Sequence, residues 1–203
     1  MDAFKISVKF YVEDDTALSQ HEFVPVLHAW IQNKLVPDHM LIDVADYAHV
    51  HNGPGTLLVA HEANFYLDRF DGRLGLTYSR KMPAEGVFRD RLRQAFKAAL
   101  EACARLESDA RLAGRISFGL TEAMVRLDDR LLAPNTAETF EQVRSDLERL
   151  AAGLYEGSSV EIEHYPSARG LFEVHLQASE APGVATLLHR LSAGQGAAPV
   201  PAR

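Results

Sequence analysis

The chain has 203 residues, 47% hydrophobic and 24% charged, which suits one compact domain or two intimately packed half-domains with a sizeable core. Its formal net charge of −7 disfavours general nucleic-acid binding, which needs cations to displace counterions. The chain has a single cysteine, starts without a signal-peptide pattern and has no apolar run near the ~18 residues of a membrane span. We therefore expect a soluble, cytoplasmic protein that contacts neither membranes nor nucleic acids.

The hydrophobic periodicity and the turn residues predict an alternation of strands and helices. Residues 4–13 alternate between apolar and polar side chains, which is typical of a half-buried strand. Ser19 and Glu22 have the spacing of a capping box before the first helix, and Asn135 and Glu138 repeat it before the third. In chain order, we expect a strand over 4–13, a helix over 23–35, strands over 41–51, 56–68 and 74–81, a helix over 86–107, a strand over 115–128 that bends at Gly119, a helix over 138–154, strands over 159–165 and 171–178, and a helix over 182–191.

This order of elements predicts an α+β fold, a two-layer sandwich in which helices pack on one face of a mostly antiparallel sheet. Each half runs strand, capped helix, hairpin and closing helix, which favours two βαββ-like halves in a pseudo-twofold arrangement over a chance recurrence. We place the first half at 1–110, the second at 111–192 and a disordered tail rich in Ala, Gly and Pro at 193–203.

Two turns fix the register expected in the first hairpins. Gly53-Pro54 and Asp71-Gly72 suit the central positions of tight hairpin turns. With those turns, Asp46 falls opposite His61 on the core face, and Arg80 lies one diagonal step from His61. A carboxylate beside an imidazole in an apolar strip perturbs pKa values and suits general acid–base catalysis, with Arg80 anchoring an anionic substrate. The alternative is a structural pair.

The opposite face of these strands is expected to be polar and aromatic. The candidate binding residues on it are Tyr47, His49, Glu62, Asn64, Tyr66 and Lys81, with Glu62 directly opposite Lys81. His49 and His51 point to one side of a strand, but two ligands do not make a zinc site, so we expect no metal and no cofactor. In the second hairpin, Glu163 is expected opposite Glu173 on a solvated face.

Two further features receive structural interpretations. The basic run Arg80, Lys81, Arg89, Arg91, Arg93 and Lys97 is interrupted by acids, so we interpret it as the solvated face of a helix. Cys103 falls on the apolar side of its helix, which favours a small core residue over a nucleophile.

Three functions fit these patterns, and none has a sequence motif. We favour a non-catalytic binding or assembly module, in which the polar-aromatic face contacts another protein or a second copy of the chain. The alternatives are a small enzyme using Asp46, His61 and Arg80, and a sensor that binds a small molecule in a groove between the halves.

Overall fold

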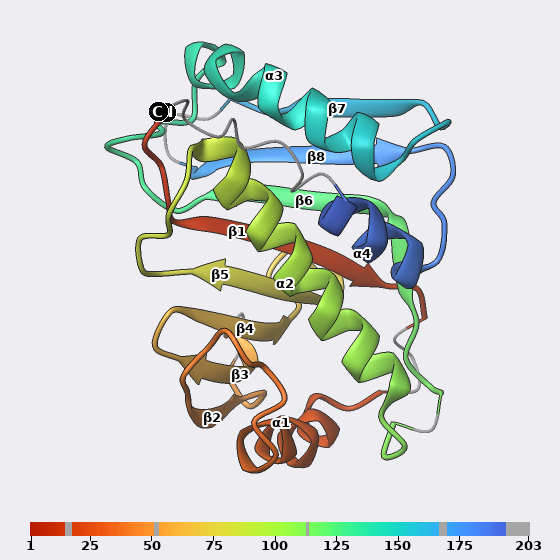
Figure 1. Cartoon of the computed structure of the whole chain (residues 1–203). Helices are drawn as coiled ribbons and strands as arrows, with labels where there is room; N and C mark the ends of the chain where they lie inside the picture. Colours follow the sequence, from red (N-terminus) through yellow and green to blue (C-terminus); the bar gives the residue numbers. More distant parts are fainter. Residues whose placement is uncertain (15–17, 51–52, 113, 167–169, 194–203) are drawn as a thin grey trace, which may run out of the picture.

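The computed structural model describes residues 1–14, 18–50, 53–112, 114–166 and 170–193. Its centre is one eight-stranded sheet in the order β2-β3-β4-β5-β1-β6-β8-β7, and each neighbouring pair is antiparallel. The α-helices lie together on one face of this sheet (Figure 1). The fold is therefore the predicted α+β sandwich, and the two predicted halves contribute to a single sheet.

The elements follow the predicted order, with one predicted strand divided in two. The strands are β1 (Ile6–Val12), β2 (Leu41–Tyr47), β3 (Gly55–Ala60), β4 (Ala63–Asp68), β5 (Gly75–Arg80), β6 (Phe118–Leu127), β7 (Val160–His164) and β8 (Phe172–Ala178). The helices are the short 3-10 turn η1 (Gln20–Glu22), α1 (Phe23–Gln32), α2 (Phe88–Ser108), α3 (Ala137–Leu154) and α4 (Val184–Ala193). No helix among the described residues is long and apolar enough to cross a membrane.

The chain takes the same path twice, starting from the middle of the sheet. From β1 it passes through α1 to the edge strand β2 and returns through β3, β4 and β5 to pair with β1. From β6 it passes through α3 to the other edge strand, β7, and returns through β8 to pair with β6. This path is compatible with the predicted duplication, and the pseudo-twofold relation itself stays a prediction.

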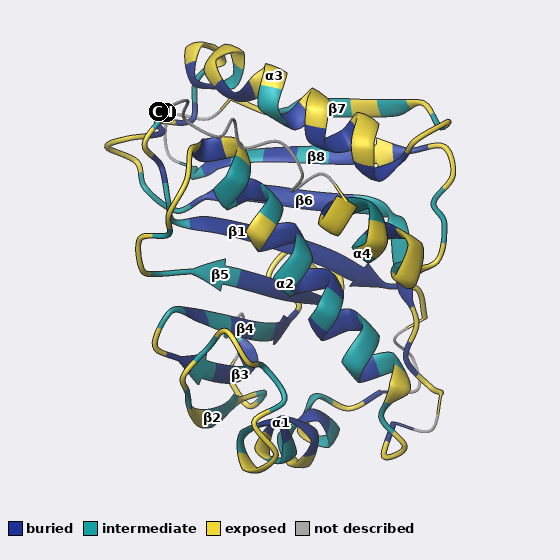
Figure 2. Cartoon of the chain, viewed as in Figure 1, coloured by how far each residue is buried: buried dark blue, intermediate teal, exposed yellow. Residues whose placement is uncertain are grey.

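The hydrophobic core lies between the sheet and the helices. α2 crosses β1 and β5, and Phe96 packs edge-to-face on Phe10 with ring centroids 6.0 Å apart. α1 covers β2 and β3, and Trp30 packs on Phe65 with centroids 6.4 Å apart. In Figure 2 the central strands and the inner sides of the helices are buried, whereas the outer sides of α3 and α4 are exposed. Cys103 is fully buried in α2, as expected of a core residue.

A tight turn at His61 and Glu62 divides the predicted strand 56–68 into β3 and β4. The His61 N–H donates to the Met40 carbonyl at 2.9 Å, and Glu62 Oε2 accepts from the Met40 N–H at 2.8 Å. These bonds hold the turn against the start of β2. Neither turn residue is of a type that signals a turn, so the prediction of one continuous strand was wrong.

β1 is buried on both faces, which corrects the prediction of a half-buried strand. Its apolar side chains face the helices. On the other side, the β4–β5 connection, residues 69–74, lies over Lys9 and Tyr11 and excludes solvent from them. The bend predicted at Gly119 is present, because the register between β1 and β6 shifts between Phe10 and Tyr11.

The two predicted capping boxes have different outcomes. The Ser19 N–H donates to Glu22 Oε1 at 3.0 Å, so the first is confirmed. The second is wrong: α3 is capped by Thr136, whose Oγ1 accepts from the Thr139 N–H at 3.3 Å. Asn135 instead bonds His164 at 2.7 Å, so its side chain joins the start of α3 to β7.

Candidate functional site: the helix-free face of the sheet

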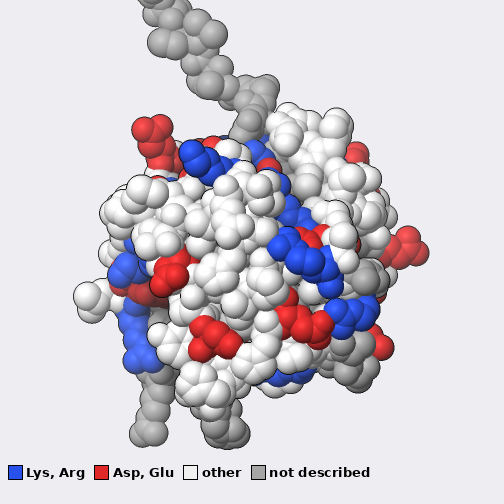
Figure 3. All heavy atoms as spheres, turned by 90° about the horizontal axis from the view of Figure 1, so that it is seen from below, with Lys and Arg blue, Asp and Glu red and all other residues white. Residues whose placement is uncertain are grey.

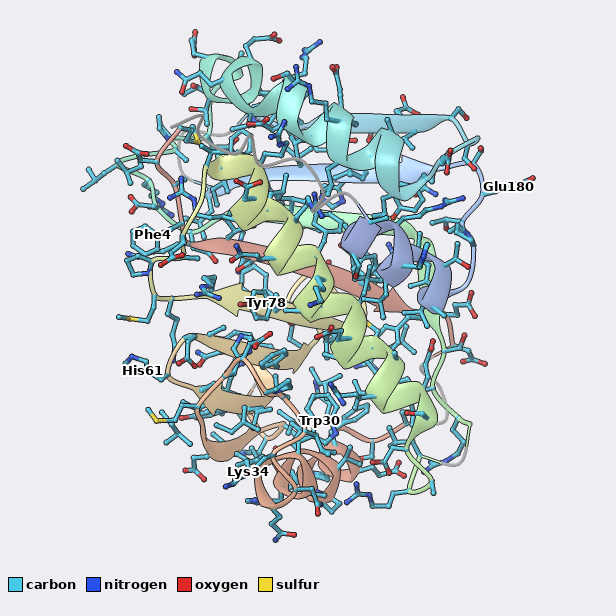
Figure 4. The ribbon with its side chains drawn as sticks, viewed as in Figure 1. Phe4, Trp30, Lys34, His61, Tyr78 and Glu180 are labelled. Atoms are coloured by element: carbon cyan, nitrogen blue, oxygen red, sulfur yellow. The ribbon has the colours of Figure 1, made fainter. Side chains whose placement is uncertain are left out.

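The structure separates the residues of the predicted acid–base site. Asp46 lies opposite Thr56 rather than His61, because the β2–β3 connection spans residues 48–54 and is therefore centred nearer β2 than the predicted Gly53-Pro54 turn. His51 of the predicted histidine pair and Asn52, which precedes the predicted Gly53-Pro54 turn, lie outside the described residues. His61 is exposed at the outer end of the sheet (Figure 4). The predicted Asp46–His61 contact is therefore wrong.

Each of the three residues has other partners. Asp46 Oδ2 lies 2.6 Å from His21 Nδ1, and its pKa is lowered by the Ala48 N–H bond and by His21. Arg80 lies opposite Ala63, as the Asp71-Gly72 turn predicts. Its guanidinium, however, reaches Tyr78 rather than His61.

The face of the sheet opposite the helices is polar, and no described helix covers it (Figure 1). We call it the helix-free face. The strand pairings place on it Asp43, Ala45 and Tyr47 from β2, Leu57 and Val59 from β3, Asn64, Tyr66 and Asp68 from β4, Gly75, Thr77 and Ser79 from β5, Ser7, Lys9 and Tyr11 from β1, Glu122, Met124 and Arg126 from β6, Glu173, His175 and Gln177 from β8, and Glu161 and Glu163 from β7.

Three of the predicted binding residues share this face, namely Tyr47, Asn64 and Tyr66. Asn64 Nδ2 donates to Tyr66 Oη at 2.8 Å. His49 lies in a turn beyond β2. Glu62 and Lys81 are opposite each other, as predicted, because the Lys81 N–H donates to the Glu62 carbonyl at 2.9 Å.

At the centre of the helix-free face, a buried lysine holds the β4–β5 connection to the sheet. Lys9 Nζ donates to Asp68 Oδ1 at 3.0 Å, to Asp71 Oδ1 at 2.7 Å and to the Arg73 carbonyl at 3.0 Å. An ammonium has three donors, so all of them are used. Burial raises the pKa of Asp71, but the hydrogen bond and charge of Lys9 outweigh it and lower that pKa overall. Burial and the bond to Asp71 raise the pKa of Tyr11. This cluster is a structural clamp.

A second polar cluster joins β1, β5 and β6. Asp128 accepts hydrogen bonds from Ser7 Oγ and, at 3.3 Å, from Ser79 Oγ. Arg126 Nε donates to its other oxygen at 2.7 Å. Because these donors come from three strands, the cluster fixes the central strands relative to each other.

Towards β7, the helix-free face becomes acidic and exposed. His175 Nε2 lies 3.0 Å from Glu173 Oε1, and this hydrogen bond raises the pKa of His175. Tyr165 is 61% exposed and donates to Glu163. Glu163 lies opposite His175 rather than Glu173, so the predicted register of this hairpin is wrong. The hairpin residues 167–169 lie outside the described part of the chain.

Two hollows open beside the β4–β5 connection. One, of about 210 Å³, is lined by residues that include Phe70, Met124 and Glu173. The other, of about 560 Å³, lies at the end of the sheet beside Tyr11 and Glu122. Phe70 lines the smaller hollow and is 73% exposed, so this part of the surface has both a protruding aromatic residue and a recess.

The most strongly bonded residues of this face were not among the sequence candidates. The alternation of residues 4–13 placed Lys9 on the polar side, but Asp68 and Asp71 lie about sixty residues further along the chain. Only the Asp71-Gly72 turn hinted at a connection there. The register of three strands was needed to bring these charges together.

The described residues contain no group of three or more His, Cys, Asp or Glu side chains placed to hold a metal ion. The basic run is not uniformly solvated, which corrects its interpretation. Arg91 Nη2 donates to the Met1 carbonyl at 3.1 Å, and Arg93 bonds the Leu191 carbonyl. Seen from below, basic and acidic residues are interspersed (Figure 3).

Comparisons with protein-family models, curated proteins and solved structures found no match to this chain. The site therefore has to be interpreted from its own chemistry.

Proposed function

We propose that this protein is a non-catalytic binding module that docks a positively charged partner protein on the helix-free face. The observation that carries the proposal is the composition of that uncovered face. With the β4–β5 connection included, its carboxylates outnumber its cations: Asp43, Asp68, Asp71, Asp128, Glu122, Glu161, Glu163 and Glu173 against Lys9, Arg69, Arg73 and Arg126. Complementary charge steers partners and sets specificity.

Exposed aromatic side chains supply the apolar contacts that such an interface needs. Phe70 and Tyr165 are 73% and 61% exposed. Aromatic residues are enriched at protein interfaces because they bury much area at little entropic cost. The hollow beside Phe70 can receive partner side chains.

Acidic residues on an edge strand can also serve only to prevent edge-to-edge aggregation. Glu161 and Glu163 on β7 fit that explanation. Glu173 on β8 does not, since that strand is paired on each side. Glu122 on the internal strand β6 is neutralised by Arg73, whose Nη1 lies 2.7 Å from its Oε1. The acidic strip therefore extends further than edge protection requires.

A basic partner suits this face better than a second copy of the chain. A twofold dimer brings the same patch of both copies together, so carboxylates would face carboxylates. This distinguishes the two partners that the sequence left open.

Charge reversal tests the proposal. The wild type, the face variant Glu161→Lys/Glu163→Lys and the control Glu141→Lys/Glu148→Lys on the exposed side of α3 are each used to retrieve proteins from the source cells. We expect a protein that binds the wild type and the control but is lost with the face variant. Reconstituted from pure components, its Kd should rise at least about tenfold in the face variant and increase steeply with salt.

Three outcomes contradict the proposal. They are equal loss of binding in both variants, a complex insensitive to salt, and a concentration-dependent dimer of the chain alone that the face variant abolishes.

A further inference from the structure

A cleft of about 310 Å³ opens on the helix side of the sheet, between α2 and the α1–β2 connection. Phe65 of β4 and Tyr78 of β5 line it from the sheet, and His39 lines it from the connection. Its volume lies in the range of small-molecule sites. The cleft is on the other side of the sheet from the helix-free face, so it is independent of the function proposed above.

One side of α2 forms a wall of this cleft. Gln94, Lys97, Ala98, Glu101 and Arg105 recur every three or four residues, so they share one side of the helix. The wall is thus partly charged and partly apolar. Figure 4 shows Tyr78 at the level of α2, where the sheet faces this helix.

His39, Tyr78 and Arg80 form a chain of hydrogen bonds. Arg80 Nη1 donates to Tyr78 Oη at 3.3 Å, because a guanidinium can only donate. Tyr78 Oη lies 3.1 Å from His39 Nε2. If His39 donated here, the tyrosine proton would have no acceptor among the described residues, so we assign the tyrosine as donor to Nε2. Burial lowers the pKa of His39, and the neutral ring then carries its proton on Nδ1.

The Nδ1 atom of His39 is buried and has no acceptor among the described residues. A buried donor without an acceptor is destabilising, and a ligand oxygen that accepts from it removes that cost. The aromatic rings of Phe65 and Tyr78 pack around the imidazole, with centroids 5.4 and 5.6 Å from it. They hold its orientation and offer no strong acceptor of their own.

The cationic side chains of the cleft are incompletely compensated. Lys97 Nζ lies 3.7 Å from Glu101 Oε1. Arg105 lines the cleft, and its side chain forms no hydrogen bond or ion pair with the described residues. Among the described residues, Arg80 bonds the Met82 carbonyl at 3.1 Å and the neutral Tyr78 hydroxyl and no carboxylate. The lining holds two carboxylates, Asp38 and Glu101, against the three cations Arg80, Lys97 and Arg105, so the cleft keeps an excess of one positive charge.

We infer that this cleft binds a small organic carboxylate, whose oxygens accept from His39 Nδ1 and from the guanidinium groups of Arg80 and Arg105. A planar carboxylate matches the fork of a guanidinium. The apolar body of the ligand packs on Phe65 and on Ala98. Inorganic phosphate has no such body, so an aryl or alkyl carboxylate fits the whole cleft better.

Calorimetric titration of the purified chain tests the inference. The probes are benzoate, phenylacetate and hexanoate, with benzyl alcohol as the neutral counterpart and inorganic phosphate as the anion without an apolar body. We expect at least one carboxylate to bind about tenfold or more tightly than benzyl alcohol. Arg80→Met and Arg105→Met should each weaken it by about tenfold or more, which is the usual loss for one charged hydrogen bond.

Arg89→Met is the matched control, because Arg89 is exposed on α2 and does not line the cleft. It should leave the carboxylate Kd unchanged. The Arg105 side chain loses no partner in the described part of the chain, so its variant remains informative if Arg80→Met unfolds. The inference is overturned if no carboxylate binds at 10 mM, if benzyl alcohol binds as well, if phosphate alone binds, or if Arg105→Met behaves like Arg89→Met.

Discussion

Replacing Lys9 by methionine removes the charge at the centre of the helix-free face while keeping a side chain of similar length. Lys9 is 1% exposed and donates to Asp68, Asp71 and the Arg73 carbonyl. In the variant, Asp68 stays buried with a side-chain exposure of 8% but loses its ammonium partner. We expect a marked loss of stability, because an uncompensated buried charge is more costly than either the pair or its apolar replacement.

The size of the expected stability loss depends on which contacts Asp68 and Asp71 keep in the variant. Breaking a buried ion pair from one side costs about 3–5 kcal/mol. Asp68 keeps bonds from Thr77 Oγ1 at 2.6 Å and from the Phe70 N–H at 3.0 Å. The Asp71 side chain is 34% exposed and can be rehydrated. We therefore expect the lower end, about 3 kcal/mol, and a Tm lower by about 6–12 °C for a chain of this size.

Urea unfolding followed by the fluorescence of Trp30 and by far-UV circular dichroism measures this loss. The triple variant Lys9→Met/Asp68→Asn/Asp71→Asn is the control, because it removes the charges together. We expect it to recover at least about half of the lost stability. A loss below about 1 kcal/mol in Lys9→Met, or no recovery in the triple variant, would refute the clamp.

Four further predictions concern single sites. Gly55 has a φ of +68°, and a Cβ there would lie 2.0 Å from a backbone oxygen of β4, so Gly55→Ala should destabilise by more than about 1 kcal/mol in urea unfolding. The raised pKa of His175 means that its ion pair with Glu173 contributes stability below about pH 6.5 and loses it as the pH rises through the folded pKa; Glu173→Gln should lower that pKa in an NMR titration. Burial raises the pKa of Cys103, so Ellman's reagent should react with it only after unfolding. Tyr155 Oη is buried without a hydrogen-bond partner among the described residues, so Tyr155→Phe should leave stability unchanged or raise it by about 1 kcal/mol in the same urea assay.

Much of the fold was predictable because local patterns determine it. Alternation identified β1, and the helical period identified α1, α2 and α3. The Asp71-Gly72 turn was a sufficiently specific signal to give the β4–β5 register, including Arg80 opposite Ala63. The same signal correctly grouped Asn64 and Tyr66 with the polar face.

The register of β2 and β3 was not predictable in the same way. Gly53-Pro54 resembles a tight turn, but it belongs to a connection that spans residues 48–54. Which residues meet across a hairpin depends on where its connection is centred. The predicted Asp46–His61 pair required a connection centred between Gly53 and Pro54, whereas the observed connection is centred nearer β2, so one error in the loop removed the candidate site.

The hydrogen bonds of the cleft could not be predicted from the sequence, because they join segments that are far apart in the chain. His39 meets Tyr78 across thirty-nine residues of sequence, and it does so only because the α1–β2 connection folds over β5. No spacing rule relates two such positions. Arg80 was chosen for a site with His61 and instead shares a hydrogen-bond chain with a different histidine.

The helix-free face has two regions with different chemistry: the central strands around Lys9, and the strands β8 and β7. In the first, Lys9 and Asp68 are buried and all three donors of the Lys9 ammonium are used, so this cluster stabilises the fold and Lys9 has no donor left for a ligand. In the second, Glu161, Glu163 and Tyr165 are exposed, and their charge is available to a partner. A docking interface should therefore be centred on β8 and β7, with Phe70 at its margin, and variants of the buried clamp should weaken partner binding only as far as they unfold the protein.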